Sequence, residues 1–120
     1  MKEEAPRRDV TMIELLYFEG CPSATQTETL LRRVLAEEGR TIPLTKIAVE
    51  TPEQAAAIGF LGSPTVRVNG RDIEPARVDE PGGALGCRLY PTERGRSGVP
   101  LEELVRAAVR TLPPTHERAS

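Results

Sequence analysis

The sequence predicts one α/β domain with the element order β-α-β-α-β-β-α: a four-stranded mixed sheet, helices on both faces and a long loop before the last helix. Three observations predict this fold class. An apolar run leads directly into a helical pattern within residues 11–38. An Asn69-Gly70 pair, the strongest short hairpin signal, separates two strand patterns. Apolar residues recur at helical spacing over residues 100–112, and 120 residues suffice for one core.

The first strand and helix are predicted from their apolar patterns. Residues 11–18 form a strand in which most positions are apolar, as in a strand covered on both faces. Residues 22–38 form a helix that ends at Gly39. The helix carries one apolar stripe, made by Leu30, Leu31, Val34 and Leu35.

The start of this helix carries a cysteine. Either Cys21 is the N-cap with Pro22 at the first helical position, or Ser23 is the N-cap of a capping box with Gln26. In both cases the sulfur lies within about one turn of the helix start, where the helix dipole favours a thiolate. Free cysteines are commonly inert apolar residues, but this position in the chain favours a reactive thiol.

The middle of the chain predicts a strand, a short helix and a hairpin. Residues 42–49 form a strand, which Pro43 places at a sheet edge. The run Thr51-Pro52-Glu53-Gln54 predicts a capping box opening a helix that Gly59 ends. Residues 66–68 and 71–74 form the arms of the hairpin. The first two strands, joined through a helix, are expected to lie parallel with a right-handed crossover.

The last third of the chain is predicted as a long loop and a helix. Residues 75–98 show no clear period, and connections of this length are usually functional or disordered. They include the run Gly86-Cys87-Arg88-Leu89-Tyr90, which we expect to pack against the domain. Residues 100–112 form the last helix. We expect a domain at residues 11–112 between flexible tails, residues 1–10 and 113–120.

Composition excludes several classes of function. The net charge of −2 and the few aromatic residues argue against nucleic-acid binding. No apolar run approaches the roughly 18 residues that span a membrane, and the polar N-terminus lacks an apolar signal-peptide centre, so we expect a cytoplasmic protein. Two cysteines and one histidine cannot form a four-ligand zinc site, and no cofactor is predicted. In a reducing compartment the cysteines are free thiols or a transient redox pair.

Three motifs, in this order, resemble the thioredoxin superfamily: a strand followed by Gly20-Cys21-Pro22, then Gly62-Ser63-Pro64-Thr65 before the third strand, then the hairpin and closing helix. The resemblance covers residues 11–112. It implies a cis Ser63–Pro64 bond beside Cys21, with Ser63 presenting main-chain groups to an extended thiol substrate. By the same resemblance, the substrate-binding positions are Pro22, Ser63, Pro64 and Thr65.

The sequence departs from this superfamily at the second motif cysteine. Thioredoxins carry Cys-x-x-Cys, whereas here the motif is Cys21-Pro22-Ser23-Ala24. Exchange therefore proceeds through Cys21 alone, with an outside thiol releasing the product, or Cys87 is the resolving thiol. Cys87 is equally explained as a small residue that anchors the loop. The expected partner is a thiol or disulfide, of a protein or of glutathione, although no glutathione motif is convincing; the oligomeric state is left open.

A narrower resemblance is to short bacterial thioredoxin-like proteins, some of them labelled as related to alkylmercury lyase. It is carried by residues 16–22 and 60–75 and by the run Cys87-Arg88-Leu89-Tyr90. Three functions remain open: a thiol-dependent oxidoreductase with Cys21 as nucleophile, a mercury- or thiol-binding or sensing module using Cys21 and Cys87, and a non-catalytic interaction protein. Two thiolates suit a soft metal such as mercury.

The charged residues around the long loop complete the candidates. Five arginines lie in or near this loop: Arg71, Arg77, Arg88, Arg94 and Arg96. They could hold an anionic thiol ligand, but charges in such a loop are more often simply solvated. Organomercurial cleavage would also need a proton donor near carbon. Four carboxylates in this region are candidate proton donors, namely Asp72, Glu74, Asp79 and Glu80. Nothing in the sequence distinguishes one of them.

Overall fold

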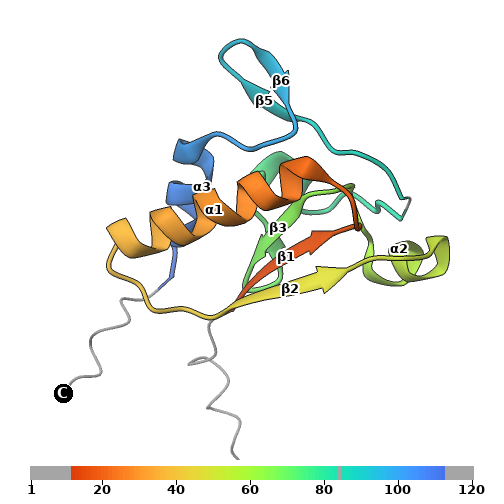
Figure 1. Cartoon of the computed structure of the whole chain (residues 1–120), viewed down its shortest axis with the longest axis horizontal. Helices are drawn as coiled ribbons and strands as arrows, with labels where there is room; N and C mark the ends of the chain where they lie inside the picture. Colours follow the sequence, from red (N-terminus) through yellow and green to blue (C-terminus); the bar gives the residue numbers. More distant parts are fainter. Residues whose placement is uncertain (1–11, 84, 113–120) are drawn as a thin grey trace, which may run out of the picture.

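In the computed structural model, a four-stranded mixed sheet forms the centre of the chain (Figure 1). Strand β1 (Ile13–Tyr17) lies parallel to β2 (Leu44–Ala48) and antiparallel to β3 (Thr65–Val68). Strand β4 (Arg71–Asp72) pairs antiparallel with β3, so the order is β2-β1-β3-β4. This confirms the predicted sheet and its thioredoxin-like topology.

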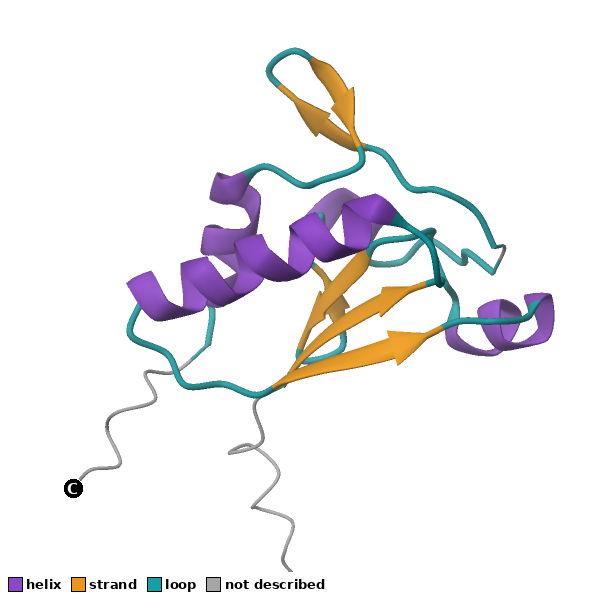
Figure 2. Cartoon of the chain, in the orientation of Figure 1, coloured by secondary structure: helices purple, strands orange, loops and turns teal. Residues whose placement is uncertain are grey.

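Helices cover both faces of the sheet, as predicted (Figure 2). On one face α1 (Pro22–Glu37) and α3 (Glu102–Val109) pack against the side chains of Ile13, Leu15, Val66 and Val68. On the other face α2 (Pro52–Ile58) contributes Ala55 to a smaller cluster with Leu16, Val49 and Phe60. The alternation of Leu15 and Leu16 between the two clusters follows from the period of two along a strand.

The helix starts follow the sequence signals closely. Cys21 is the N-cap of α1, with extended φ and ψ of −84° and 109°, and Pro22 opens the helix. This decides between the two predicted starts in favour of Cys21. Thr51 and Gln54 form the predicted capping box of α2, and Gly59 ends that helix in the left-handed conformation.

The region predicted as a long loop without a clear period, residues 75–98, contains regular structure. A 3₁₀ turn, η2, spans Pro75–Arg77, and a separate hairpin pairs β5 (Tyr90–Thr92) with β6 (Gly95–Ser97). Strands of three residues carry too few alternations to show a period in the sequence. Figure 1 shows this hairpin projecting beyond α1, away from the sheet. The last helix is shorter than predicted.

The structure describes residues 12–83 and 85–112. The tails predicted at residues 1–10 and 113–120 lie outside this part of the chain. Among the helices within it, none combines the length and the apolar character that crossing a membrane requires.

Candidate functional site

Cys21 lies in the turn that connects the end of β1 to the start of α1. Its backbone N–H donates to the carbonyl of Phe18 at 3.3 Å, and its side chain is half-buried. The first turn of α1, which is fully described, contains no acidic residue. The partial positive charge of the helix start therefore acts on the thiol without a neighbouring carboxylate in that turn to offset it.

The connection that precedes β3 meets this turn at Ser63. The Ser63–Pro64 peptide bond is cis, as expected. The Cys21 thiol donates to the Ser63 carbonyl oxygen at 3.8 Å, and the Ser63 hydroxyl oxygen accepts from the backbone N–H of Phe18 at 3.3 Å. Two hydrogen bonds thus join the turn that carries Cys21 to the residue before the proline.

The segment that carries Cys87 pairs with the other edge of Ser63. The N–H of Ser63 donates to the Gly86 carbonyl at 2.8 Å, and the N–H of Arg88 donates to the Ser63 carbonyl at 3.0 Å. These bonds form a parallel bridge between Ser63 and Cys87. The approach is close: a Cβ at Gly62, whose φ is +112°, would lie 2.9 Å from the Cβ of Arg88. The main-chain groups that the resemblance assigns to a substrate are therefore hydrogen-bonded to the chain itself.

Arg88 anchors this segment in the interior. Its side chain is fully buried and donates two hydrogen bonds to Asp72, at 2.6 and 2.7 Å, and one to Glu74 at 3.0 Å. It also donates to the Thr65 hydroxyl at 3.3 Å and lies 4.2 Å from the centre of the Tyr90 ring. Burial lowers the pKa of the guanidinium, but the hydrogen bonds that it donates to Asp72 and Glu74 and the charges around it together outweigh burial, so the pKa lies above its ordinary value.

The prediction of Arg88 as a solvated loop charge is wrong. It is the largest fully buried side chain among the described residues, and Asp72 is buried with it. The sequence carries no local signal for this burial, because its hydropathy would place Cys87 and Leu89 inside instead of Arg88. In the run from Gly86 to Tyr90, Cys87 and Leu89 are exposed and Arg88 and Tyr90 are buried, which is the alternation of an extended segment. By contrast, Arg77 is a surface charge that pairs with Glu80.

Tyr90 fixes the same segment to the proline. Its hydroxyl donates to the Pro64 carbonyl at 2.7 Å, and its ring is buried. Burial raises the pKa of Tyr90 above its ordinary value, so the phenol keeps the proton that it donates. Together with Arg88, it holds the Cys87 segment against the connection that contains Ser63 and Pro64.

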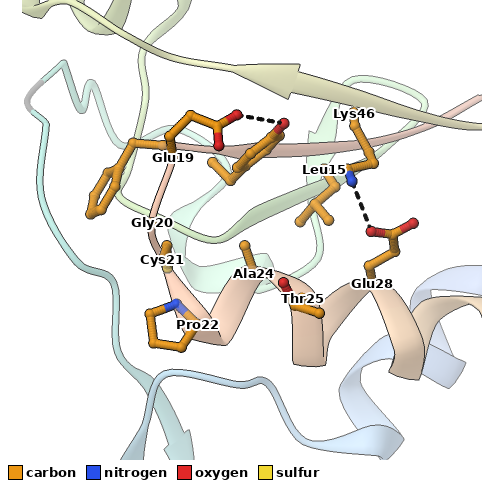
Figure 3. Close-up of a pocket in the computed structure, with 11 residues that line it drawn as sticks. Leu15, Glu19, Gly20, Cys21, Pro22, Ala24, Thr25, Glu28 and Lys46 are labelled. Atoms are coloured by element: carbon orange, nitrogen blue, oxygen red, sulfur yellow. Dashed lines mark hydrogen bonds and ion pairs between the residues drawn. The ribbon is translucent and has the colours of Figure 1, made fainter.

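A pocket of about 350 Å³ opens beside Cys21 on the β2 side of β1 (Figure 3). Its walls come from the end of β1, the first turns of α1 and Lys46 of β2. Lys46 pairs with Glu28 at 3.0 Å, and the Tyr17 hydroxyl donates to Glu19 at 3.5 Å. The pocket is within the size range of small-molecule sites.

Five of the predicted site residues meet at one place. Cys21 and Cys87 flank Ser63, and Pro22 and Pro64 adjoin them. The hydroxyl of the sixth, Thr65, donates to Gly62 and accepts from Arg88, so it belongs to the support of this place. No cluster of three or more metal-ligating side chains occurs within residues 12–83 and 85–112. The Cys21 thiol contacts Ser63 directly, whereas Cys87 is paired with Ser63 through its main chain.

Comparison of the chain with family models, with curated proteins and with solved structures finds no match. The functional argument therefore stands on the geometry described above.

Proposed function

We propose that the chain is a short member of the thioredoxin superfamily that performs thiol–disulfide exchange, with Cys21 as nucleophile and Cys87 as resolving thiol. One observation carries the proposal. Ser63 accepts a hydrogen bond from the Cys21 thiol through its carbonyl and pairs with Cys87 through its main chain. The thioredoxin-like topology and the cis Ser63–Pro64 bond support the assignment to the superfamily.

The orientation of the bridge supports a role for Cys87. In a parallel pairing, the side chains of directly paired residues project to the same side. The Ser63 hydroxyl reaches the backbone of Phe18, in the turn that leads to Cys21. We therefore expect the Cys87 side chain to leave its segment on the side of that turn, and Cys87 is an exposed free cysteine.

The reaction balances in two exchanges. The Cys21 thiolate attacks one sulfur of a substrate disulfide, the sulfur–sulfur bond breaks, and the leaving thiolate takes the electron pair and a proton from water. The Cys87 thiolate then attacks the Cys21 sulfur and releases the second substrate thiolate. The chain is left with a Cys21–Cys87 disulfide, and two equivalents of an external thiol reduce it while being oxidised to a disulfide.

The test uses a small neutral disulfide, bis(2-hydroxyethyl) disulfide, with mass spectrometry of the quenched protein. The wild type is expected to form an internal disulfide and release two thiols per chain. Cys87→Ser is expected to stop at the mixed disulfide on Cys21, and Cys21→Ser to react at least tenfold more slowly, because the exposed Cys87 lacks a helix start.

Two outcomes would overturn the proposal. One is a wild type that accumulates the mixed disulfide without ever forming the internal one. The other is a Cys21→Ser variant that reacts as fast as the wild type. The first result would remove Cys87 from the reaction and leave the single-thiol route, in which an outside thiol releases the product from Cys21. The second would remove Cys21 as nucleophile and favour a non-catalytic interaction protein.

The same pair of thiols supports a second candidate, a soft-metal module related to the alkylmercury lyase resemblance. Two thiolates on either side of one residue suit a two-coordinate soft ion such as Hg²⁺. The probe is Hg²⁺ itself, added at one equivalent and followed by gel filtration in a monothiol buffer. The wild type is expected to retain the ion and Cys87→Ser to lose it. Equal retention by the two proteins would rule the module out.

A further inference from the structure

We propose that Cys21 attacks a low-molecular-weight disulfide that carries an ammonium group and binds in the pocket between α1 and β2. An extended polypeptide is not the substrate. This names the substrate class of the proposed exchange and rests on that function. The inference comes from three features: the main chain at Ser63 that is already paired, the pocket on the opposite side of Cys21, and the charges in its wall.

The paired main chain at Ser63 closes the site to an extended chain. An extended peptide binds at a strand edge through free N–H and carbonyl groups. At Ser63 the N–H is bonded to Gly86 and the carbonyl to Arg88 and the Cys21 thiol. Displacing the segment would also withdraw Arg88 from Asp72, and leaving one partner of a buried pair alone costs more than the two new hydrogen bonds would return.

The pocket leaves the other side of Cys21 open. Ser63 reaches the thiol from the β3 side of β1, whereas the pocket lies between α1 and β2 and includes no residue of the Cys87 segment. Figure 3 shows its wall running from Glu19 past Cys21 and Ala24 to Glu28. A small disulfide seated there would face the Cys21 sulfur opposite the Cys87 segment. That is the arrangement a second, in-line displacement by Cys87 needs.

The charges of the wall select the sign of the ligand. Its carboxylates are Glu19 and Glu28, and its one ammonium is Lys46. Glu28 is already paired with Lys46 and with Arg32, which lies 2.9 Å away and does not line the pocket. Lys46 is occupied by Glu28 at 3.0 Å and lies 5.6 Å from the centre of the Tyr17 ring. Glu19 has no ion-pair partner among the described residues, so its carboxylate is available to a ligand ammonium. An anionic disulfide would meet this carboxylate and the Cys21 thiolate together.

The first experiment measures charge selection at low ionic strength. The rates at which Cys21 forms a mixed disulfide are compared for cystamine, bis(2-hydroxyethyl) disulfide and dithiodiglycolate. Each rate is divided by the rate of the same disulfide with N-acetylcysteine amide, which corrects for intrinsic reactivity. We expect the wild type to prefer cystamine over dithiodiglycolate by about tenfold after this correction, and Glu19→Gln to reduce the preference about threefold. Glu93→Gln, in the turn of the β5–β6 hairpin, removes the same charge elsewhere and is expected to leave it unchanged.

Salt provides an independent check on the same ratio. Because Glu19 is exposed, its contribution is expected to fall toward zero at 1 M ionic strength, where the screening length is about 3 Å. A preference that is absent, or that Glu19→Gln and salt both leave unchanged, would overturn the charge selection.

The second experiment measures size at constant chemistry. A neutral decapeptide whose single cysteine carries a 2-hydroxyethylthio group presents the same kind of disulfide as the neutral small substrate. We expect it to react with Cys21 at least tenfold more slowly. Equal rates would show that the segment yields to an extended chain and would overturn the proposal.

The reaction with bis(2-hydroxyethyl) disulfide distinguishes a failure of this inference from a failure of the proposed exchange. If that compound does not react with Cys21 at all, the proposed exchange fails. If it reacts and forms the internal disulfide, but charge and size make no difference, only the substrate class is wrong.

Discussion

The two thiol-bearing segments meet at Ser63, but different forces hold them there. Cys21 is placed by local structure, as the N-cap between β1 and α1. Cys87 lies outside any helix or strand and is placed by the neighbouring Arg88, whose buried side chain binds residues of the sheet and its hairpin. The comparison teaches that a local signal positions the nucleophile, whereas one long-range ion pair positions its candidate partner.

The largest expected effect comes from removing that ion pair. Arg88→Ala leaves the Asp72 carboxylate buried at 9% exposure without its guanidinium. Loss of one partner of a buried pair costs about 3–5 kcal/mol of unfolding free energy. Urea unfolding of the reduced protein measures it, and in native buffer the internal Cys21–Cys87 disulfide is expected to form more slowly.

The matched control for Arg88 is Arg96→Ala, an exposed arginine in β6. It is expected to change stability by less than about 0.5 kcal/mol. If the two variants unfold alike, the ion pair does not hold the segment, and the contrast between the two cysteines would fail.

The second effect comes from the glycine that lets the segment approach. At Gly62 a side chain would be strained by the φ of +112° and would press on the backbone and Cβ of Arg88 at 2.9–3.2 Å. We expect Gly62→Ala to cost about 2 kcal/mol and to slow internal disulfide formation, as measured by mass spectrometry after oxidation.

Gly86→Ala is the control within the same segment. A Cβ there meets nothing within 4 Å, and its φ lies outside the left-handed region. Its stability and its rate of disulfide formation are expected to match the wild type. An equal loss in both variants would point to general loosening of the loop instead of the contact at Gly62.

The features that the sequence predicts are those that local structure determines, and the features that it misses depend on long-range contacts. The helix start at Cys21, the capping box at Thr51, the hairpin at Asn69-Gly70 and the cis Ser63–Pro64 bond are visible in the sequence because neighbouring residues determine them or a resemblance supplies them. The pairing of Cys87 with Ser63 spans 24 residues and depends on a buried arginine. In the sequence, Arg88 is one arginine among five, so nothing local distinguishes it.

A smaller effect, of the opposite sign, is expected at Cys21. Cys21 has the extended backbone of an N-cap, but its side chain makes no capping hydrogen bond to the helix. A serine hydroxyl accepts such a bond well, so Cys21→Ser is expected to stabilise the reduced protein by about 0.5–1 kcal/mol while slowing its reaction with the disulfide at least tenfold. Urea unfolding measures the gain, and a loss of stability would contradict it.

Cys87→Ser serves as the control for this gain. It makes the same chemical change at an exposed position that caps no helix. Its stability is expected to stay within about 0.3 kcal/mol of the wild type. If both serine variants gain equally, the effect belongs to the loss of a thiol and not to the helix start.

The smallest effect concerns the surface ion pairs that tie the helix of Cys21 to α3. Hydrogen bonds from Arg110 and Arg106 lower the pKa of Glu38 from 4.5 to about 2. A carboxyl with a depressed pKa stabilises the folded state above its unfolded pKa, and this contribution is lost as the pH falls toward the folded one. Glu38→Gln is therefore expected to be less stable than the wild type above pH 4.5, with the difference vanishing toward pH 2.

Unfolding curves between pH 7 and pH 2 measure this difference, with Glu103→Gln as the control. Glu103 lies exposed in the first turn of the same α3. Its variant is expected to follow the wild type in parallel across the range. Because the Glu38 pairs lie at the surface, 0.5 M salt is expected to shrink the difference, whereas the Arg88→Ala loss is expected to persist, since screening barely reaches a buried pair. If Glu38→Gln remains less stable than the wild type at pH 2 and in 0.5 M salt, packing and not charge joins α1 to α3. The position of Cys21 would then depend on the core as well as on its local sequence.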